Sequence, residues 1–344
     1  TGLLNETYGS GAEAAYSTRR LNGNVTDCMV IRRASDSTTT TIGFDGSGNI
    51  SEADIISFCT GTTCTVEEWL DQSGNGNDAT QSTPADQPTI YTGGELVRDN
   101  GKLALDFDGS SDNFASTISN IAQSFDIYTV HSFDTTPTAT ERLYDSDNGG
   151  RITRGSNNTS DNFVFAGTVL SWSPQQTGQV QETTIYNGVN SIVRVSGTQT
   201  ASGDAGTGST GTDLVIGADK TATSQHIDGQ IQEFIVFDNS KNTSDRTSIE
   251  ENIGDYFTQN TPLLDTYSGA AAAYSLRLLD STFTGSAIRV RRASNNDEQD
   301  IGFNVFGELD TVALAAFCGS SDGFIRTWYD QSGNSNDAEQ DPTS

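Results

Sequence analysis

The sequence predicts a mainly β protein in which a β-sandwich follows a small α+β module, and the module returns at the end of the chain. Short apolar segments alternate with turns of Gly, Ser, Thr, Asn and Asp between residues 100 and 240. Only 33% of the residues are hydrophobic, which suits short strands joined by many polar turns. The third observation is an internal repeat, because residues 263–340 restate residues 3–81.

The repeat sets the expected domain organisation. Residues 14–19 (AAYSTR) return as 272–277 (AAYSLR), and residues 71–75 (DQSGN) return unchanged as 330–334. We predict a first module over 1–85, a sandwich over 86–259 and a second module over 260–344, tandemly repeated. We also expect the chain to be a window onto a longer array, in which units contact only their neighbours.

Each module is expected to mix helices and strands. Ala, Leu and Arg favour a short helix over 12–21, which returns at 270–279. Another helix is predicted at 52–58 and again at 310–317. The predicted strands cover 29–33, 41–44 and the segment that ends at Trp69, which corresponds to 325–329 in the second module.

Alternating apolar segments mark the strands of the sandwich. They lie at 103–109, 127–133, 162–166, 183–186, 191–195, 214–217 and 230–237. Residues 196–212 are predicted to form a loop rich in Gly, Thr and Ser. A helix is then expected to begin at the N-cap Ser244, with Asp245 in its first turn, and to run to Phe257.

The net charge of −28 arises from 46 acidic and 18 basic residues. Such a chain would be repelled by a phosphate backbone and by an anionic bilayer, so nucleic acid is not an expected partner. No apolar run approaches the roughly 18 residues that a membrane-spanning helix requires, so no membrane span is predicted.

Cysteine spacing predicts one disulfide. Cys59 and Cys64 lie close enough to close a tight surface bridge, which would fit an oxidising compartment. The second module keeps Cys318 but has Gly323 and Ala287 where Cys64 and Cys28 stand in the first. The bridge is therefore dispensable to the module, and Cys28 and Cys318 could be free thiols.

Calcium is the one cofactor that the residues suggest, because carboxylate, amide and carbonyl oxygens bind it. The candidate ligands form three clusters: Asp106, Asp108 and Asp112; Asp71, Asn75, Asn77 and Asp78; and Asp145, Asp147 and Asn148. Turn formation is the alternative for each cluster, since Asp and Asn side chains bond their own backbone in turns.

Sugar recognition on one face of the sandwich would need exposed aromatic side chains. Trp172, Tyr186 and Tyr144 are the candidates, and core packing is the alternative.

Two stretches of the middle region carry a family resemblance. They are Leu105–Asp112 (LDFDGSSD) and Asp228–Phe237 (DGQIQEFIVF), followed by the helix that ends at Tyr256. Residues 100–258 resemble a concanavalin-type jelly roll of the laminin-G-like class. This resemblance implies a fold, whereas its members serve sugar binding, adhesion, hydrolysis and spacing alike.

The opening module has its own signature. It comprises the AYSTR start at 15–19, the RASD block at 33–36, the loop from Cys59 to Cys64 and DQSGNGN at 71–77. This module is similar to the N-terminal part of the catalytic domain of the family 54 α-L-arabinofuranosidases. It also resembles a module repeated in large phage and marine-bacterial surface proteins, upstream of a laminin-G-like domain.

The family 54 resemblance implies two catalytic carboxyl groups about 5 Å apart. Asp219, at the end of 214–219 (LVIGAD), is similar to the acid/base aspartate of that family. The strand expected to carry the nucleophile glutamate, 150–155 (GRITRG), has no carboxylate. Without a nucleophile the covalent route is lost, and Asp219 is then an ordinary loop residue.

We therefore expect a non-catalytic structural or adhesive repeat of an extracellular fibre, filament or virion appendage, located at a cell or virion surface. Its expected partners are copies of itself in a linear assembly and surface glycans. The alternative is a glycoside hydrolase related to the α-L-arabinofuranosidases, with Asp219 as its one candidate catalytic residue.

Overall fold

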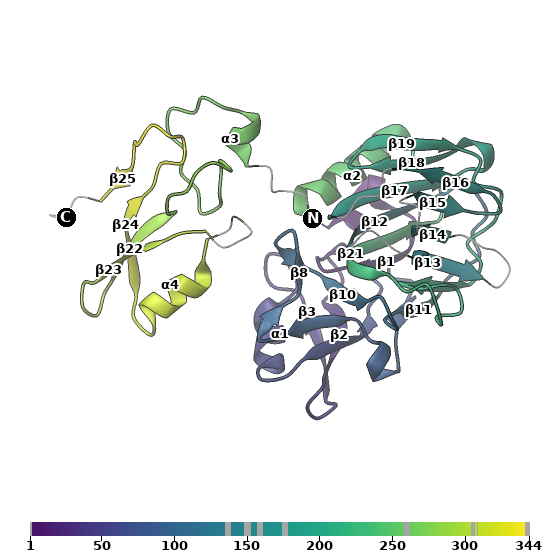
Figure 1. Cartoon of the computed structure of the whole chain (residues 1–344), viewed down its shortest axis with the longest axis horizontal. Coiled ribbons are helices and arrows are strands. Elements are labelled where there is room, and N and C mark those ends of the chain that lie inside the picture. Colours follow the sequence, from purple (N-terminus) through teal and green to yellow (C-terminus); the bar gives the residue numbers. More distant parts are fainter. Residues whose placement is uncertain are drawn as a thin grey trace. The chain divides into compact units, whose positions relative to one another are not determined.

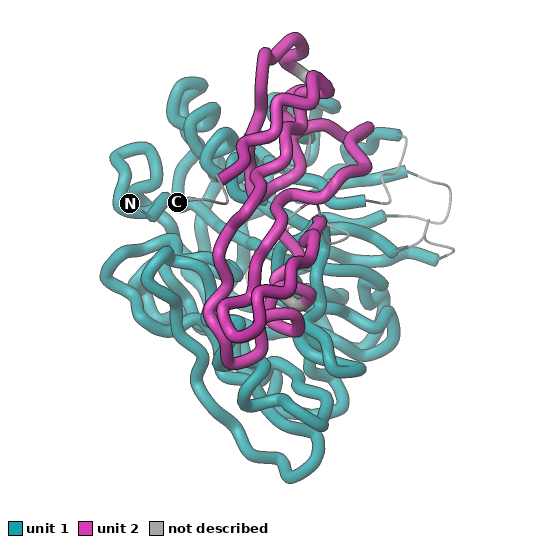
Figure 2. The backbone as a smooth tube through the Cα atoms, turned by 90° about the vertical axis from the view of Figure 1, so that its left-hand side faces the viewer, with its two compact units in different colours: residues 1–257 teal, residues 258–344 magenta. Residues whose placement is uncertain are grey.

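The computed structural model describes residues 2–134, 139–147, 153–156, 161–173, 178–257, 262–303, 307 and 309–340. The chain forms two compact units, Thr1–Phe257 and Thr258–Ser344, which Figure 2 distinguishes by colour. The first unit contains both the opening module and the sandwich. Among the described residues, no helix is long and apolar enough to cross a membrane.

The first sheet of the sandwich is centred on a long strand, β21, in the upper right of Figure 1. One edge of β21 pairs with β1 and β10, and the other edge pairs with β12. Beyond β12 the sheet is extended by β17, β18 and β19, each paired with the strand before it. All these pairings are antiparallel. The strands are β1 Ala12–Ser17, β10 Leu105–Asp108, β12 Phe125–Phe133, β17 Val180–Tyr186, β18 Ser191–Val195, β19 Thr198–Gly203 and β21 Asp228–Phe237.

The second sheet packs over the first. Its strands pair in the order β11, β20, β13, β14, β15 and β16. Their bounds are β11 Phe114–Thr117, β13 Glu141–Asp147, β14 Thr153–Ser156, β15 Asn162–Phe165, β16 Val169–Trp172 and β20 Asp213–Ile216.

The opening module adds a smaller sheet in which β2 lies between β3 and β4. Strand β4 also pairs with β5 and β6, which in turn pair with β11 and β10, so the module is continuous with both sandwich sheets. The strands are β2 Asp27–Arg33, β3 Thr39–Gly43, β4 Cys64–Trp69, β5 Ala79–Thr80, β6 Thr89–Thr92, β7 Glu95–Leu96, β8 Arg98–Asp99 and β9 Lys102–Leu103.

Helices are few. Helix α1 (Glu52–Cys59) belongs to the module, and α2 (Thr243–Phe257) covers the outer face of the first sheet. Four 3-10 helices span Leu3–Asn5, Thr7–Gly9, Pro84–Asp86 and Gly188–Asn190. These bounds confirm the predictions of a mainly β fold and of the two helices.

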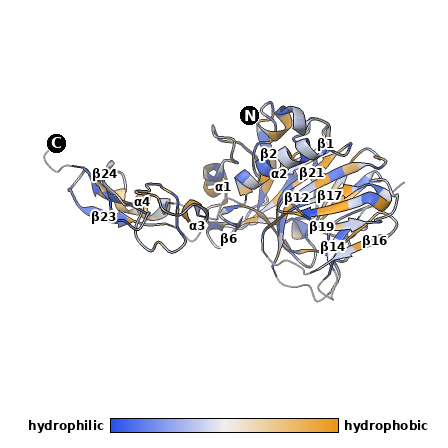
Figure 3. Ribbon diagram, turned by 90° about the horizontal axis from the view of Figure 1, so that it is seen from above, coloured by the Kyte–Doolittle hydropathy of each residue, from blue (hydrophilic) through white to orange (hydrophobic). Residues whose placement is uncertain are grey.

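Strand alternation divides β21 between two cores, because successive side chains point to opposite faces. Phe234 and Val236 belong to the core between the two sheets, whereas Ile235 and Phe237 pack against Ile249 of α2. Figure 3 shows the resulting concentration of hydrophobic residues along β21, β12 and β17.

The helix predicted over 12–21 is wrong. Residues 12–17 form β1, and Tyr16 pairs with Phe234 of β21. The weak helix propensity of an Ala-rich segment is overridden because the strand pairing buries Ala14, Ala15 and Tyr16 completely. Two further details differ from the predictions: β19 occupies part of the expected loop 196–212, and Asn242, rather than Ser244, accepts the Asp245 N–H at the start of α2.

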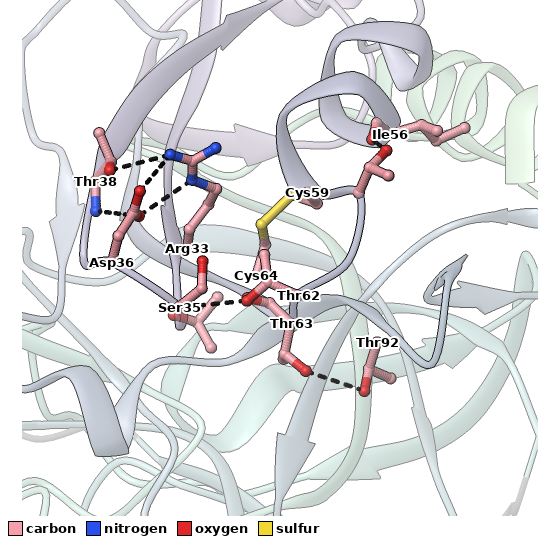
Figure 4. Close-up of a disulfide and its surroundings, with 12 residues drawn as sticks. Arg33, Ser35, Asp36, Thr38, Ile56, Cys59, Thr62, Thr63, Cys64 and Thr92 are labelled. Atoms are coloured by element: carbon pink, nitrogen blue, oxygen red, sulfur yellow. Dashed lines mark hydrogen bonds and ion pairs between the residues drawn. A yellow bond between two sulfur atoms is a disulfide. The ribbon is translucent and has the colours of Figure 1, made fainter.

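The predicted disulfide between Cys59 and Cys64 is present and joins the end of α1 to β4 (Figure 4). Next to it, Arg33 forms an exposed ion pair with Asp36, and the Ser35 N–H donates to Thr62 Oγ1. Cys28 and Cys318 are free. Burial raises the pKa of the Cys28 thiol, so this group is an inert part of the core.

The second unit repeats part of this plan. Strand β22 (Ile288–Arg292) lies between β23 (Glu298–Ile301) and β24 (Gly323–Trp328), and β24 pairs with β25 (Ala338–Glu339). Its helices are α3 (Leu263–Thr266) and α4 (Thr311–Cys318). The helix predicted at 270–279 is absent from these described residues, as it is at 12–21.

A buried ion pair joins the module to the sandwich. Arg19 Nε lies 2.8 Å from Glu233 Oε2 of β21, and Arg19 Nη1 donates to Asn252 Oδ1 of α2 at 2.7 Å. Ser17 Oγ donates to the same Glu233 oxygen at 2.6 Å. These contacts satisfy a carboxylate that has no exposed surface.

Arg19→Ala should therefore lower the free energy of unfolding by about 3–5 kcal/mol, because it leaves the Glu233 carboxylate buried without its partner. Arg33→Ala is the matched control: its partner Asp36 is exposed, so the loss should stay below about 1 kcal/mol. Urea unfolding of the two variants checks this. Equal losses would contradict the importance of the buried pair.

Candidate active site

A pocket of about 420 Å³ lies on the second sheet, over strands β13 to β16. Its lining residues are Thr140, Arg142, Thr153, Phe163, Phe165, Val169 and Ser171. Because Val164 and Trp172 on the same strands belong to the core, alternation puts the pocket on the outer face of the sheet. The pocket therefore opens away from the sandwich interior.

A glycine shapes the floor of this pocket. Gly155 of β14 lies between Arg142 and Phe163 in the paired strands. A Cβ atom at this position would stand 2.7 Å from Phe163 Cζ and 2.6 Å from the Glu141 carbonyl oxygen. The missing side chain lets the Phe163 ring lie across the strand, where the Arg142 guanidinium stands 4.8 Å from the ring centroid. The Phe163 ring is 9% exposed and is thus packed between Gly155 and Arg142 in the pocket wall.

One buried carboxylate lies next to the pocket. Asp145 of β13 is fully buried, and its Oδ1 accepts a hydrogen bond of 2.6 Å from Thr153 Oγ1 in the pocket wall. Its strand partner Val215 lies outside the core between the sheets, which places Asp145 on the outer face as well. Asp145, a candidate calcium ligand with turn formation as the alternative, lies within strand β13 rather than in a turn.

A second carboxyl group, that of the half-buried Asp161, lies one residue before β15 and is not among the residues that line the pocket. Asn162, the first residue of the strand, accepts a hydrogen bond from Arg154 Nη2 at 3.1 Å in the interior. Extending the alternation of β15 back by one residue predicts Asp161 on the same face as Phe163. The strand predicted at 162–166 could have indicated this position, had its alternation been extended by one residue.

Asp219 belongs to the loop that follows β20, and this loop is hydrogen-bonded to the first residues of β13. Gly217 N–H donates to the Leu143 carbonyl, and the Arg142 N–H donates to the Gln225 carbonyl at 2.8 Å. Gln225 Oε1 also accepts from Arg142 Nε at 2.7 Å, and Lys220 forms an ion pair with Asp147. The loop is therefore fixed to a residue that lines the pocket.

Within this loop the Asp219 carboxylate is well provided with donors. It accepts from the hydroxyl groups of Thr221 and Ser224 at 2.9 Å each and from the Thr223 N–H at 3.2 Å. Partial burial raises the pKa of Asp219, but these hydrogen bonds outweigh it and leave the pKa below its ordinary value. Asp219 is ionised at neutral pH.

Behind the pocket the strands are held by a fully buried ion pair. Arg154 of β14 donates from Nε and Nη2 to Glu182 of β17 at 2.7 and 2.8 Å. Its Nη1 donates to the Gly155 carbonyl at 2.7 Å. The pair therefore fixes the backbone that carries Gly155 and Asn162 without itself facing the pocket.

The aromatic residues expected to bind sugar lie in the interior. Trp172 is 8% exposed and stacks on the Arg154 guanidinium at 4.9 Å. Tyr144 and Tyr186 are buried, and their hydroxyl oxygens lie 3.0 Å apart. Trp172, Tyr144 and Tyr186 therefore pack in the core, which is the alternative given for them. The aromatic residues that line the pocket are Phe163 and Phe165.

The first two calcium candidates serve as hydrogen-bond acceptors or donors. Asp108 Oδ1 accepts N–H bonds from Ser110, Ser111 and Asp112, and Asp106 accepts from Gln230. Asp71 accepts N–H bonds from Ala15, Ser73 and Asn77, while the amides of Asn75 and Asn77 donate to the Glu13 carbonyl. These are the turn contacts named as the alternative.

The third candidate cluster falls partly outside the described residues, which do not include Asn148. Across the described ranges, no group of three or more His, Cys, Asp or Glu side chains is arranged to hold a metal ion. Calcium binding stays a prediction.

Further carboxyl groups meet where the two sheets end together. Asp228 N–H, at the start of β21, donates to Glu141 Oε2 at 3.1 Å. Burial raises the pKa of Glu141 to about 7, and the negative charges of Asp228 and Asp134 add to this. Burial likewise raises the pKa of Asp112 to about 7, with repulsion from Asp108 as the next cause.

The chain is similar to a known family of glycoside hydrolases. The model of the family described as "Alpha-L-arabinofuranosidase B, catalytic" matches residues 5–111 and 256–344, more than half of the chain. The chain belongs to this family. Both modules thus carry the family signature.

Curated relatives match over one short segment. Alpha-L-arabinofuranosidase B of Emericella nidulans is 42% identical over 88 residues, which cover 23% of this chain and 17% of the relative. The enzyme of the same name from Aspergillus kawachii is 43% identical over 74 residues, 21% of this chain and 15% of the relative. The matched segments therefore span less than a fifth of these relatives.

Solved structures support the fold over a much longer stretch. A family 54 α-L-arabinofuranosidase soaked with a cyclic sulfate inhibitor has a TM-score of 0.56 at 17% identity, covering 86% of this chain and 71% of that one. An arabinofuranosidase complexed with arabinofuranosyl-α-1,2-xylobiose has a TM-score of 0.54 at 17% identity, covering 97% and 73%. At this identity the likeness is one of fold.

These findings correct the expected function. The laminin-G-like and phage-fibre reading, and with it the non-catalytic structural or adhesive repeat, is overturned by the match to the arabinofuranosidase family. The expectation of a non-catalytic chain rested on the absence of a carboxylate from residues 150–155. Thr153, Arg154 and Gly155 carry none and 150–152 lie outside the described residues, but Asp145 on the paired strand β13 accepts a hydrogen bond from Thr153.

The raised pKa values of Glu141 and Asp112 predict a pH-dependent stability. In the unfolded chain both carboxyl groups ionise near their ordinary pKa values, about 4, whereas the folded protein holds their protons up to about pH 7. The free energy of unfolding should therefore fall as the pH rises from about 4 to 7.

Glu141→Gln and Asp112→Asn should each flatten this fall, because an amide has no proton to lose, and the exposed Asp213→Asn should leave it unchanged. Thermal unfolding at a series of pH values measures the effect. A slope in either variant as steep as that of the parent chain would contradict the assignment of the two groups.

Proposed function

We propose that the chain is a glycoside hydrolase that cleaves α-L-arabinofuranosides at the pocket over β13 to β16. The observation that carries the proposal is a pocket in which Phe163 lies beside Arg142 and the wall residue Thr153 is hydrogen-bonded to the buried carboxylate of Asp145. Family membership supports the same substrate class. The curated relatives that share the signature are named α-L-arabinofuranosidases.

The proposed reaction uses Asp161 and Asp219. The Asp161 carboxylate attacks the anomeric carbon while Asp219 gives a proton to the departing glycosidic oxygen, which leaves a covalent arabinosyl ester on Asp161. Asp219 then takes a proton from water, and the water oxygen attacks the same carbon and releases Asp161. Two displacements retain the anomeric configuration. Asp145 stays hydrogen-bonded to Thr153 and shapes the pocket wall.

The role of general acid requires that Asp219 be protonated during the reaction. A general acid must hold its proton at the working pH, but the donors Thr221, Thr223 and Ser224 keep the resting carboxylate ionised. We propose that some of these bonds are exchanged when sugar occupies the pocket. The enzyme should consequently work best at acid pH, where Asp219 is protonated more often.

Ser224→Ala tests this requirement, because it removes one donor to the carboxylate and so raises the pKa of Asp219. The alkaline limb of the kcat/KM profile should move to higher pH. The control is Thr200→Ala, an exposed hydroxyl on β19 that contacts no residue of the loop. An unchanged alkaline limb in Ser224→Ala would contradict an acid role for Asp219.

The direct test of the function is hydrolysis of 4-nitrophenyl α-L-arabinofuranoside. Asp161→Asn and Asp219→Asn should each lower kcat by at least about 100-fold, the scale of a lost acid/base or nucleophile. The exposed helix residue Asp54→Asn is the matched control and should keep full activity. Folded parent chain that releases no nitrophenol, or equal activity in all three variants, would contradict the proposal.

We also propose an extracellular location. The disulfide of the module, whose two cysteines are buried in the core rather than at the predicted surface position, fits an oxidising compartment, and an arabinose-bearing polymer is an extracellular substrate class. Copies of the chain and surface glycans as partners, and a location at a cell surface, stay predictions.

A further inference from the structure

We infer that the second unit carries a docking face for another β-sandwich of the kind formed by residues 100–257, joined to the second module as the first sandwich is joined to the first. The two modules share a fold and a sequence signature, so each serves as a reference for the other. On one face of the second module, apolar side chains are exposed whose equivalents in the first module are buried.

The internal frame of the two modules is the same. Asp71 Oδ1 accepts the Ala15 N–H at 2.9 Å, and its equivalent Asp330 accepts the Ala273 N–H at 2.7 Å. The Gln72 N–H donates to the Ala15 carbonyl at 2.8 Å, as the Gln331 N–H does to the Ala273 carbonyl. The repeated DQSGN motif thus holds the same segment in place in both copies.

An aromatic pair on this frame is also conserved in geometry. The rings of Tyr16 and Trp69 lie 5.9 Å apart, and those of Tyr274 and Trp328 lie 5.9 Å apart. In the first module both rings are fully buried, because Phe234 and Phe114 of the sandwich stand 6.3 and 6.2 Å away. In the second module Tyr274 is 38% exposed and Trp328 is 37% exposed.

Neighbouring side chains extend the exposed face. Ile325 is 48% exposed, whereas its equivalent Val66 is fully buried, and Leu276 is 45% exposed where Thr18 is buried. We call this set, Tyr274, Leu276, Ile325 and Trp328, the docking face. A contiguous apolar face of this kind marks an interaction surface. Phe324 is exposed on the other face of β24, where Arg291 lies over its ring.

The backbone of the second module also has a segment that could pair with an added strand. In the first module Ala12–Ser17 is strand β1, which pairs with β21. The equivalent residues, 270–275, are described and belong to no strand. An added strand would pair with this segment by β-augmentation. The Tyr274 side chain would then face the core of the added sandwich, as Tyr16 does in the first.

The occupant follows from the first copy. The segments that bury Tyr16 and Trp69 are β21 and β11 of a sandwich, and β21 also supplies Glu233 to Arg19. A second copy of this chain does not offer these segments, because its own β21 is already paired with β1, β10 and β12. The fitting occupant is a further sandwich with an unpaired strand equivalent to β21.

The test appends a second copy of residues 86–259 after Ser344, which continues the register of the internal repeat. Hydrogen exchange is followed in peptides covering 270–277 and 323–328, with 12–19 and 64–69 of the same molecule as references. Exchange of the first two should become at least about tenfold slower in the extended chain and approach the reference rates. Phe234→Asp in the appended copy should reverse the gain, and Val169→Asp there, on the exposed pocket rim, should not.

Three results would overturn the inference. One is unchanged exchange at 270–277 in the extended chain. Another is a bimodal isotope pattern in peptides of β12, which the two sandwiches share, because it would mean that the module does not complete the appended sandwich. The last is slow, concentration-dependent exchange in the original chain, since a second copy would then cover the face.

Discussion

The pairing of β1 with β21 is the contact on which the architecture depends. Tyr16 and Arg19 come from the opening module, and Phe234 and Glu233 come from near the end of the sandwich, more than 200 residues later. The strand that receives them contributes to both cores of the first unit. Because the buried Glu233 carboxylate is neutralised by Arg19, the sandwich is complete only when the module is in place. The module is therefore part of the sandwich rather than an appendage, and the two form one compact unit.

The pocket is a consequence of the second sheet. A register shift in β13 between Arg142 and Tyr144 turns Arg142 toward Phe163, and the absence of a side chain at Gly155 lets that ring lie flat. The buried Arg154–Glu182 pair holds the strands beneath. The buried carboxylate of Asp145 adjoins the pocket through Thr153, and the loop that carries Asp219 is hydrogen-bonded to Arg142 through Gln225.

Much of the fold could be predicted from the sequence because alternation and turn chemistry act locally. The strands at 127–133 and 230–237, the helices α1 and α2 and the Cys59–Cys64 bridge follow from such local patterns. The segment 12–17 could not be assigned correctly, because its strand state depends on a partner far along the chain. The same limit applied to the site. Asp161 and Asp219, the two carboxyl groups of the proposed reaction, are separated by 58 positions, and their segments are connected only through the pairing of β13 with β14 and β20 and of β14 with β15.

The most direct test of the proposed chemistry is covalent trapping with an arabinofuranosyl cyclic sulfate, followed by digestion and peptide mass mapping. A nucleophilic carboxylate opens the cyclic sulfate and keeps the sugar as an ester, so the labelled residue is identified without reference to turnover. The account predicts one adduct, on Asp161, which is lost in Asp161→Asn and retained, though formed more slowly, in Asp219→Asn. An adduct on Asp219, Asp145 or Glu141, or no adduct on folded protein, would contradict it.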